Sequence, residues 1–215
     1  MKFIDCPSPN FNERAQGSAI DKLVLHYTGM HNSEISLARM GDSSSKVSSH
    51  YLINEVGMVY QLVNEDKRAW HAGISYWAGQ TDINSQSIGI ELQNPGHEWG
   101  YQDFPDAQIG ALVDLAASIV NRYNISAKQI LGHSDIAPER KQDPGEFFPW
   151  GRIATQNIGY WPIVELIDTL HVSSEDSTRM NLSLIGYNPK ASFVATVTAF
   201  QRHFRPTKVD GIVDT

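Results

Sequence analysis

Apolar residues recur along the first 170 positions with two kinds of spacing, one typical of strands and one typical of helices. Short apolar runs predict strands over residues 22–26, 50–54, 58–63, 87–93 and 129–133. Gly57 stands between the second and third of these runs and predicts a hairpin turn. Helical spacing predicts helices over residues 33–40, 105–123 and 163–170. Strands that alternate with helices in this way predict a mixed α/β domain.

Two of these elements carry predictions about single side chains. The strand over 87–93 alternates cleanly, so Glu91 is expected to point away from its apolar face. The helix over 33–40 is expected to begin at Ser33 as its N-cap and to bury part of Ile35, Leu37 and Ala38.

Two further segments, 7–20 and 64–86, are expected to be mostly irregular. The second gathers four aromatic or imidazole side chains: Trp70, His71, Tyr76 and Trp77. A long loop of this composition usually has a function, because loops are otherwise short and polar.

The composition changes near residue 171. Residues 171–179, HVSSEDSTR, are polar and predict a linker between a domain of residues 1–170 and a small helical module of residues 180–215. In that module an apolar helical face is predicted from the spacing of Phe193, Val197, Phe200 and Phe204. Such a face has to be buried somewhere, and packing on the first domain is one possibility.

Composition and charge narrow the classes of function. Hydrophobic residues make up 41% of the 215 positions, which predicts a packed core. The net charge of −7 without a basic run argues against nucleic acid or an anionic membrane surface as a partner. The single cysteine, Cys6, excludes an internal disulfide, and its role stays open. The N-terminus shows no apolar signal segment and no apolar run reaches 18 residues, so neither a signal peptide nor a membrane-spanning segment is expected; a cytosolic location is permitted but not required.

Candidate metal ligands lie at the ends of two predicted strands. His26 ends LVLH, His133 ends ILGH, and Asp143 follows ten residues later. Two imidazoles and a carboxylate form a plausible catalytic zinc set that leaves one position for water. A lone histidine at a strand end is nevertheless more often structural.

Two charged residues suit the chemistry of such a site. Glu91 is a candidate for proton transfer, and Lys141 is a candidate for stabilising an oxyanion. Each also fits an ordinary solvated charge. His50 and His71 lie in plausible cleft segments, and the remaining histidines are expected at the surface: His31, His97, His171 and His203.

Five motifs occur in a fixed order within residues 5–165: LVLHYTG, VSSHYLI, RAWHAG, SIGIELQNPG and GHSDIAPERKQDPG. Together they resemble the zinc-dependent N-acetylmuramoyl-L-alanine amidases of the AmpD/AmiD type, the amidase-2 family. The resemblance implies a central mixed β-sheet flanked by helices, related to phage T7 lysozyme and peptidoglycan recognition proteins. It also implies one zinc ion per chain, with the family's ligands matching His26, His133 and Asp143.

The same resemblance implies roles for further residues. The family's catalytic glutamate and lysine match Glu91 and Lys141, and the motifs place four residues in an expected substrate groove: His50, Trp70, His71 and Asn94. The implied reaction is zinc-dependent hydrolysis of the amide bond between N-acetylmuramic acid, or its 1,6-anhydro form, and L-alanine of the peptidoglycan stem peptide, in cell-wall remodelling or recycling. A peptidoglycan recognition protein that binds without cleaving is the alternative. A general zinc peptidase is a third reading, although HExxH is missing.

The C-terminal module resembles small three-helix peptidoglycan-binding domains through AFQRHFRP and the DG that follows. Such modules continue into a further helix, whereas this chain stops at Thr215, so two alternatives stay open: a trimmed tail or an incomplete module. Two questions stay open at this point. The partner is either the intact sacculus or a released anhydro-muropeptide. The missing signal peptide resembles a cytosolic member of the family, and a wall-binding module resembles a member of the cell envelope.

Overall fold

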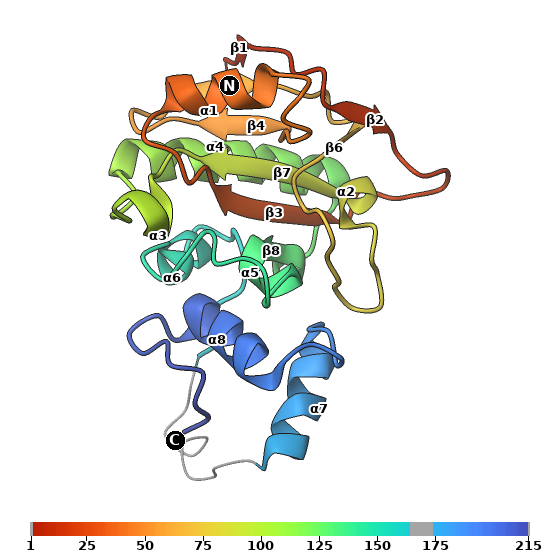
Figure 1. Ribbon diagram of the computed structural model, residues 1–215, viewed down its shortest axis with the longest axis vertical. Helices are drawn as coiled ribbons and strands as arrows, with labels where there is room; N and C mark the ends of the chain where they lie inside the picture. Colours follow the sequence, from red (N-terminus) through yellow and green to blue (C-terminus); the bar gives the residue numbers. More distant parts are fainter. Residues whose placement is uncertain (1, 164–173, 215) are drawn as a thin grey trace.

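A six-stranded mixed β-sheet forms the centre of the protein (Figure 1). The computed structural model describes residues 2–163 and 174–214. The strand order is β1 (Ile4–Asp5), β5 (Val59–Gln61), β4 (Tyr51–Ile53), β7 (Ser87–Leu92), β3 (Lys22–Tyr27) and β8 (Ile130–Gly132). β3 runs parallel to both β7 and β8, and β4 runs parallel to β7 but antiparallel to β5. The expected central mixed sheet is confirmed.

One face of this sheet is covered by the longest helix, α4 (Asp106–Tyr123). Its apolar stripe packs on side chains of β3 and β7, both of which are buried along most of their length. The stripe consists of Ile109, Leu112, Leu115, Ala116 and Ile119. Burial on both sides explains why the two central strands are so apolar, since each polar side chain there would lose contact with water. The helix predicted over 105–123 is confirmed.

The helix predicted over 33–40 exists as α1 (Ser33–Gly41), but its N-cap and buried face differ from the prediction. Asn32, not Ser33, is the cap, because its Oδ1 accepts a hydrogen bond from the backbone N of Ile35 at 2.9 Å. Leu37 is partly buried as predicted, whereas Ile35 is 47% exposed, Ala38 is exposed, and the fully buried positions are Ser36 and Met40. The Ser36 hydroxyl donates to Gln93 Oε1 at 2.7 Å, which turns this side of the helix toward the sheet.

The two segments expected to be irregular contain short elements. β2 (Phe11–Glu13) and β6 (Lys67–Ala69) pair as a two-stranded antiparallel sheet. The second segment also contains α2 (Ile83–Gln86). Short elements elsewhere in the chain are α3 (Gly96–Trp99), a 3-10 turn (Ala127–Gln129), α5 (His133–Ile136) and α6 (Trp150–Ala154). Strands of three residues are too brief to show an alternating pattern. β8 ends at Gly132, so His133 begins a helix instead of ending the strand as predicted.

The hairpin predicted around Gly57 is confirmed by the antiparallel pairing of β4 with β5. Gly57 adopts φ +81°, and a Cβ there would lie 2.6 Å from the Ala107 carbonyl oxygen. Glycine is therefore required both by the turn and by the close approach of α4.

Two helices follow the gap in the described chain, α7 (Glu175–Ile185) and α8 (Phe193–Phe204). The apolar helix predicted around Phe193 is therefore confirmed. Residues 175–179 are helical and not linker, because Ser174 caps α7. Residues 164–173 lie outside the described residues. This range includes most of the helix predicted over 163–170, the start of the predicted linker, and His171.

The apolar face of α8 packs on the sheet side opposite α4. Val197 belongs to the same buried cluster as Val24 of β3 and Ile136 of α5, and Phe193 and Phe200 pack against that cluster. Figure 1 shows α8 directly beside α5 and α6. His203 was expected at the surface, but it is buried: its ring stacks on the Trp150 ring, with 3.7 Å between the ring centroids. The surface prediction for His203 is wrong because that residue lies on the docked side of α8.

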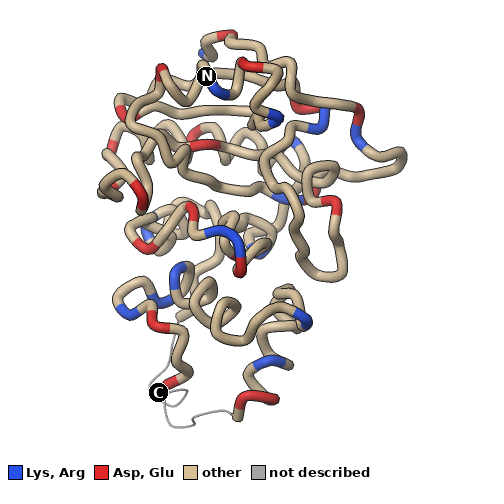
Figure 2. The backbone as a smooth tube through the Cα atoms, viewed as in Figure 1, with Lys and Arg blue, Asp and Glu red and all other residues tan. Residues whose placement is uncertain are grey.

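Acidic and basic residues are interspersed along the chain and do not gather by sign (Figure 2). Within the described residues, no helix has both the length and the apolar character needed to cross a membrane.

Candidate metal centre and active-site groove

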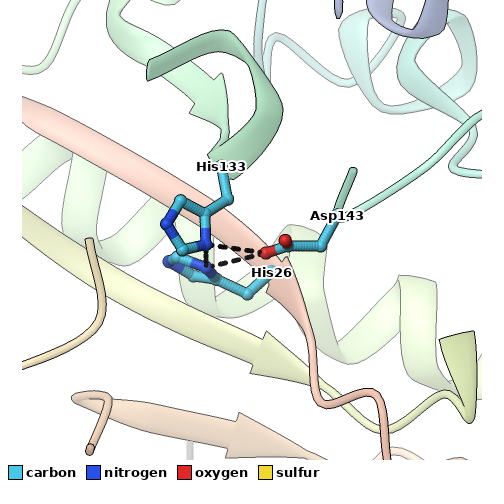
Figure 3. A group of neighbouring side chains, drawn as sticks. All are labelled: His26, His133 and Asp143. Carbon is cyan, nitrogen blue, oxygen red and sulfur yellow. Dashed lines mark hydrogen bonds and ion pairs between the residues drawn. The ribbon is translucent and has the colours of Figure 1, made fainter. Parts of the chain in front are cut away.

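Three candidate ligands meet at the C-terminal ends of two neighbouring parallel strands (Figure 3). Leu25 of β3 pairs with Gly132 of β8, so the next residue on each chain segment, His26 or His133, emerges at the same sheet edge. Asp143 comes from the loop after α5. The backbone carbonyl of Asp143 accepts a hydrogen bond from Ser134 N at 2.9 Å, which ties this loop to α5. The sequence folds this way because parallel strands place their carboxyl ends together.

The ligand atoms converge closely. His26 Nδ1 lies 2.9 Å from His133 Nδ1 and 3.0 Å from Asp143 Oδ2, and His133 Nδ1 also lies 3.0 Å from Asp143 Oδ2. All three side chains are buried. His133 Nε2 donates to the Ala72 carbonyl at 3.0 Å, so its Nδ1 is the unprotonated nitrogen of the neutral ring.

Electrostatics favour a cation at this point. Burial, together with the neighbouring His133, lowers the pKa of His26 to about 4, so its ring is neutral at pH 7. Burial by itself would raise the pKa of Asp143, but His133 and His26 hold that pKa well below its usual range. With both rings in the neutral form that metal binding requires, the two imidazole Nδ1 atoms and the carboxylate oxygen direct their lone pairs at one point, and a divalent cation there would remove the repulsion between them. The residues His26, His133 and Asp143 could hold a metal ion.

Glu91 lies on β7 directly opposite His26 of β3. Its side chain is partly buried, and its enclosed Oε2 has no hydrogen-bond partner within residues 2–163 and 174–214. Burial first, and then the negative charge of Asp143, raise the pKa of Glu91 well above its usual value. An ordinary solvated carboxylate does not have this environment, whereas a proton-transfer group does.

A groove of about 1130 Å³ opens over these residues. Its walls include Glu91, Lys141, His133 and Asp143, together with Trp70 and His71 from the aromatic segment. Residues that sequence reasoning did not single out also line it: Tyr27, Met30, His31, Trp99 and Arg140. Trp99 is 51% exposed at the rim, 4.7 Å from the His31 ring. The only sequence signal for Trp99 was its place shortly after the motif that contains Glu91.

Two residues expected in the groove, His50 and Asn94, do not line it. His50 is fully buried, accepts from Gly89 N at 2.9 Å through Nδ1, and contacts the Lys67 carbonyl through Nε2. Asn94 is buried and shapes the loop after β7: its Nδ2 donates to the Gln102 carbonyl at 2.8 Å, and its Oδ1 accepts from Gly96 N at 3.0 Å. Both residues satisfy backbone groups that burial removes from water.

Comparisons with known proteins bear on this geometry. A family model described as N-acetylmuramoyl-L-alanine amidase matches residues 16–146, which include the five candidate metal and catalytic residues: His26, Glu91, His133, Lys141 and Asp143. The chain is 39% identical to the N-acetylmuramoyl-L-alanine amidase AmiD of Escherichia coli K12, over 91% of this chain and 78% of that protein. It is 35% identical to the 1,6-anhydro-N-acetylmuramyl-L-alanine amidase AmpD of Haemophilus influenzae, over 67% of this chain and 86% of that protein.

The fold has matching solved structures. A complex of Escherichia coli AmiD with the substrate anhydro-N-acetylmuramic acid-L-Ala-D-γ-Glu-L-Lys superposes with a TM-score of 0.83 at 37% sequence identity. That match covers 95% of this chain and 93% of the other, so it includes the C-terminal helices as well as the sheet.

Proposed function

Because the chain belongs to the N-acetylmuramoyl-L-alanine amidase family, we propose that it hydrolyses the amide bond between N-acetylmuramic acid, or its 1,6-anhydro form, and L-alanine of the peptidoglycan stem peptide. We propose that one zinc ion, bound by His26, His133 and Asp143, serves this reaction. The observation that carries the proposal is the convergence of two imidazole Nδ1 atoms and one carboxylate oxygen at 2.9–3.0 Å, beside an enclosed carboxyl group.

Zinc at such a site would polarise the scissile carbonyl and make bound water more acidic. In this proposal Glu91 would take a proton from the attacking water and later give it to the leaving amine, and its raised pKa supports both steps. Lys141 lines the same groove, and its ammonium group would stabilise the negative charge that develops on the carbonyl oxygen. Trp70 and Trp99 present apolar ring surface along the groove for the rest of the substrate.

The released anhydro-muropeptide is the substrate form that we favour. Escherichia coli AmiD was solved with an anhydro-N-acetylmuramic acid peptide as substrate, and this chain is 37% identical to it across the whole fold. The name of the related AmpD also specifies the 1,6-anhydro form. These names support the assignment to the same reaction class, and we propose that the reaction serves cell-wall remodelling or recycling.

Recognition of peptidoglycan without cleavage explains the site less well. A binding groove has no use for a carboxyl group whose oxygen is enclosed and without a partner in the described chain, because that arrangement costs free energy. Proton transfer gives Glu91 a role that justifies this cost.

We expect Asp143→Ala and His133→Ala to lose zinc and, with it, amidase activity. The matched control is Asp103→Ala, which removes an exposed aspartate outside the groove. The zinc content of the purified proteins is measured by mass spectrometry. The proteins are then incubated with anhydro-muropeptide and, in parallel, with intact sacculi, and the products are identified by their mass. Zinc bound at one ion per chain in both variants would contradict the ligand assignment. A product cleaved at a peptide bond of the stem would contradict the reaction.

A further inference from the structure

A buried line of polar atoms runs from the candidate metal centre into the protein interior. His26 Nε2, on the far side of the ring from the ligand atom Nδ1, lies 3.0 Å from His71 Nδ1. His71 Nε2 lies 3.2 Å from Ser87 Oγ, and Ser87 Oγ lies 2.6 Å from the carbonyl oxygen of Ile83. The three side chains are all buried, and they come from β3, the aromatic segment and β7.

The direction of every hydrogen bond in this line follows from its inner end. A carbonyl oxygen only accepts, so the Ser87 hydroxyl donates its hydrogen to Ile83. The Ser87 oxygen is then the acceptor for His71 Nε2–H. In a neutral ring the other nitrogen carries no hydrogen, so His71 Nδ1 accepts from His26 Nε2–H. His26 Nδ1 is consequently left with a free lone pair.

The neutral form of His71 follows from its surroundings. Within the described residues its ring nitrogens contact only His26 and the Ser87 hydroxyl, and neither is an anion. A second proton on His71 would therefore bury a charge without a carboxylate partner, which is costly.

The ring of His71 sits in a slot that the sequence provides at Gly89. A Cβ at Gly89 would lie 2.5 Å from His71 Cγ, closer than real atoms approach. The backbone N of Gly89 also donates to His50, whose ring meets His71 edge to face at 5.7 Å. β7 thus holds the His71 ring against His26 by shape as well as by hydrogen bonding.

We propose that His71 is a positioning residue for the metal centre, which holds His26 in the tautomer and orientation that present Nδ1 to the metal. This inference rests on the proposed function, in that His26 is taken as a zinc ligand. It goes beyond the expectation that His71 lines the substrate groove. An outer hydrogen-bond partner of a ligating histidine typically contributes 10–100-fold to metal affinity. Ser87 extends the same line by one step.

The test measures zinc affinity in full-length protein, independently of catalysis. Each variant is stripped with a chelator and titrated with zinc in competition with a chelating dye, and its thermal unfolding without metal is recorded. His71→Leu removes the acceptor while filling the slot, and we expect its zinc dissociation constant to rise roughly 10–100-fold. His71→Asn places an amide oxygen near the former Nδ1, so most of the affinity should return. Ser87→Ala should give a smaller loss.

The matched control is Ser8→Ala, which removes another buried serine hydroxyl; within the described chain that hydroxyl contacts the Met40 carbonyl and Asn10 N, and none of His26, His71 or the other candidate ligands. Its zinc affinity should equal that of the unaltered protein. If His71→Leu does not fold, Ser87→Ala decides, because it leaves His71 in place. Unchanged affinity in the folded His71 and Ser87 variants, with zinc lost in Asp143→Ala, would overturn the positioning role and leave the metal site intact. Zinc retained by Asp143→Ala would instead overturn the metal site itself.

Discussion

Single residues at this site are distinguished by their surroundings more than by their type. Glu91 and Glu98 both line the groove, yet Glu98 is exposed whereas an oxygen of Glu91 is enclosed. Burial and the nearby Asp143 raise the pKa of Glu91 well above the usual value. The same residue type at two places in one groove therefore has different chemical capacity.

At this scale we predict that Glu91→Gln keeps the metal and loses turnover by roughly 10²–10⁴-fold, since a positioned base usually contributes that much. The amide has the shape of the carboxyl group but cannot accept the proton. Zinc content and the rate of anhydro-muropeptide hydrolysis are measured together. Glu34→Gln serves as the control, because Glu34 is exposed and lies outside the groove, and it should behave like the unaltered enzyme. A Glu91→Gln protein that turns over at a near-normal rate would show that another group takes the proton.

Among the elements, the docking of α7 and α8 on α5 has the clearest consequence. Asp135 of α5 accepts hydrogen bonds from Gly132 N at 2.7 Å, Tyr187 OH at 2.6 Å and His203 Nδ1 at 2.7 Å. Two of these three donors come from the C-terminal part of the chain. Because α5 also carries His133, the C-terminal helices support the segment that holds a candidate ligand.

We predict that Tyr187→Phe lowers the free energy of unfolding by about 1.5–3 kcal/mol, the usual worth of a hydrogen bond to a charged group. Tyr187 is fully buried, and phenylalanine fills the same space without the hydroxyl. Urea denaturation followed by circular dichroism gives the value. Tyr160→Phe is the control, because Tyr160 is 45% exposed and its change should be within experimental error. Equal effects in the two variants would mean that the bond to Asp135 contributes little.

For the whole molecule, the relation between residues 180–215 and the rest of the chain is the main question. The proposal that these residues bind peptidoglycan remains a prediction. Their apolar face lies in one cluster with Val24, Trp77 and Ile136, and Ala78 N donates to the Gly186 carbonyl at 2.8 Å. The C-terminal helices therefore contribute to one continuous core with the sheet.

From this packing we predict that deletion of residues 175–215 lowers folding stability and reduces activity on sacculi and on free anhydro-muropeptide alike. The deletion would expose the apolar cluster and remove two hydrogen bonds from Asp135. Thermal unfolding, zinc content and both activities are compared with the full chain. A tethered wall-binding module would act differently, because raising the local concentration of a polymer does not help a soluble fragment. A stable truncated protein that fails only on sacculi would therefore support wall binding and refute a purely structural role.

The chain itself determined the elements with a long repeating pattern and the chemistry of its motifs. The central strands, α4 and α8 were predictable because their apolar side chains recur over enough residues to show a period. The motifs also named the candidate site residues, because each motif is a short local pattern: His26, Glu91, His133, Lys141 and Asp143. Three-residue strands such as β2 and β6, the buried face of α1 and the helical start at His133 were not predictable, since each depends on the partner against which it packs.

Only the tertiary structure decided how these residues act together. His26 and His71 are 45 positions apart, and Tyr187 and Asp135 are 52 apart, so no local pattern links them. The burial of Glu91, the internal use of His50 and the docking of α8 also arise when distant segments exclude water from one another. Burial sets the pKa values and the hydrogen-bond directions. The sequence thus determined which groups are present, and the packing of remote segments determined which atom of each group faces the candidate metal centre, the groove or the core.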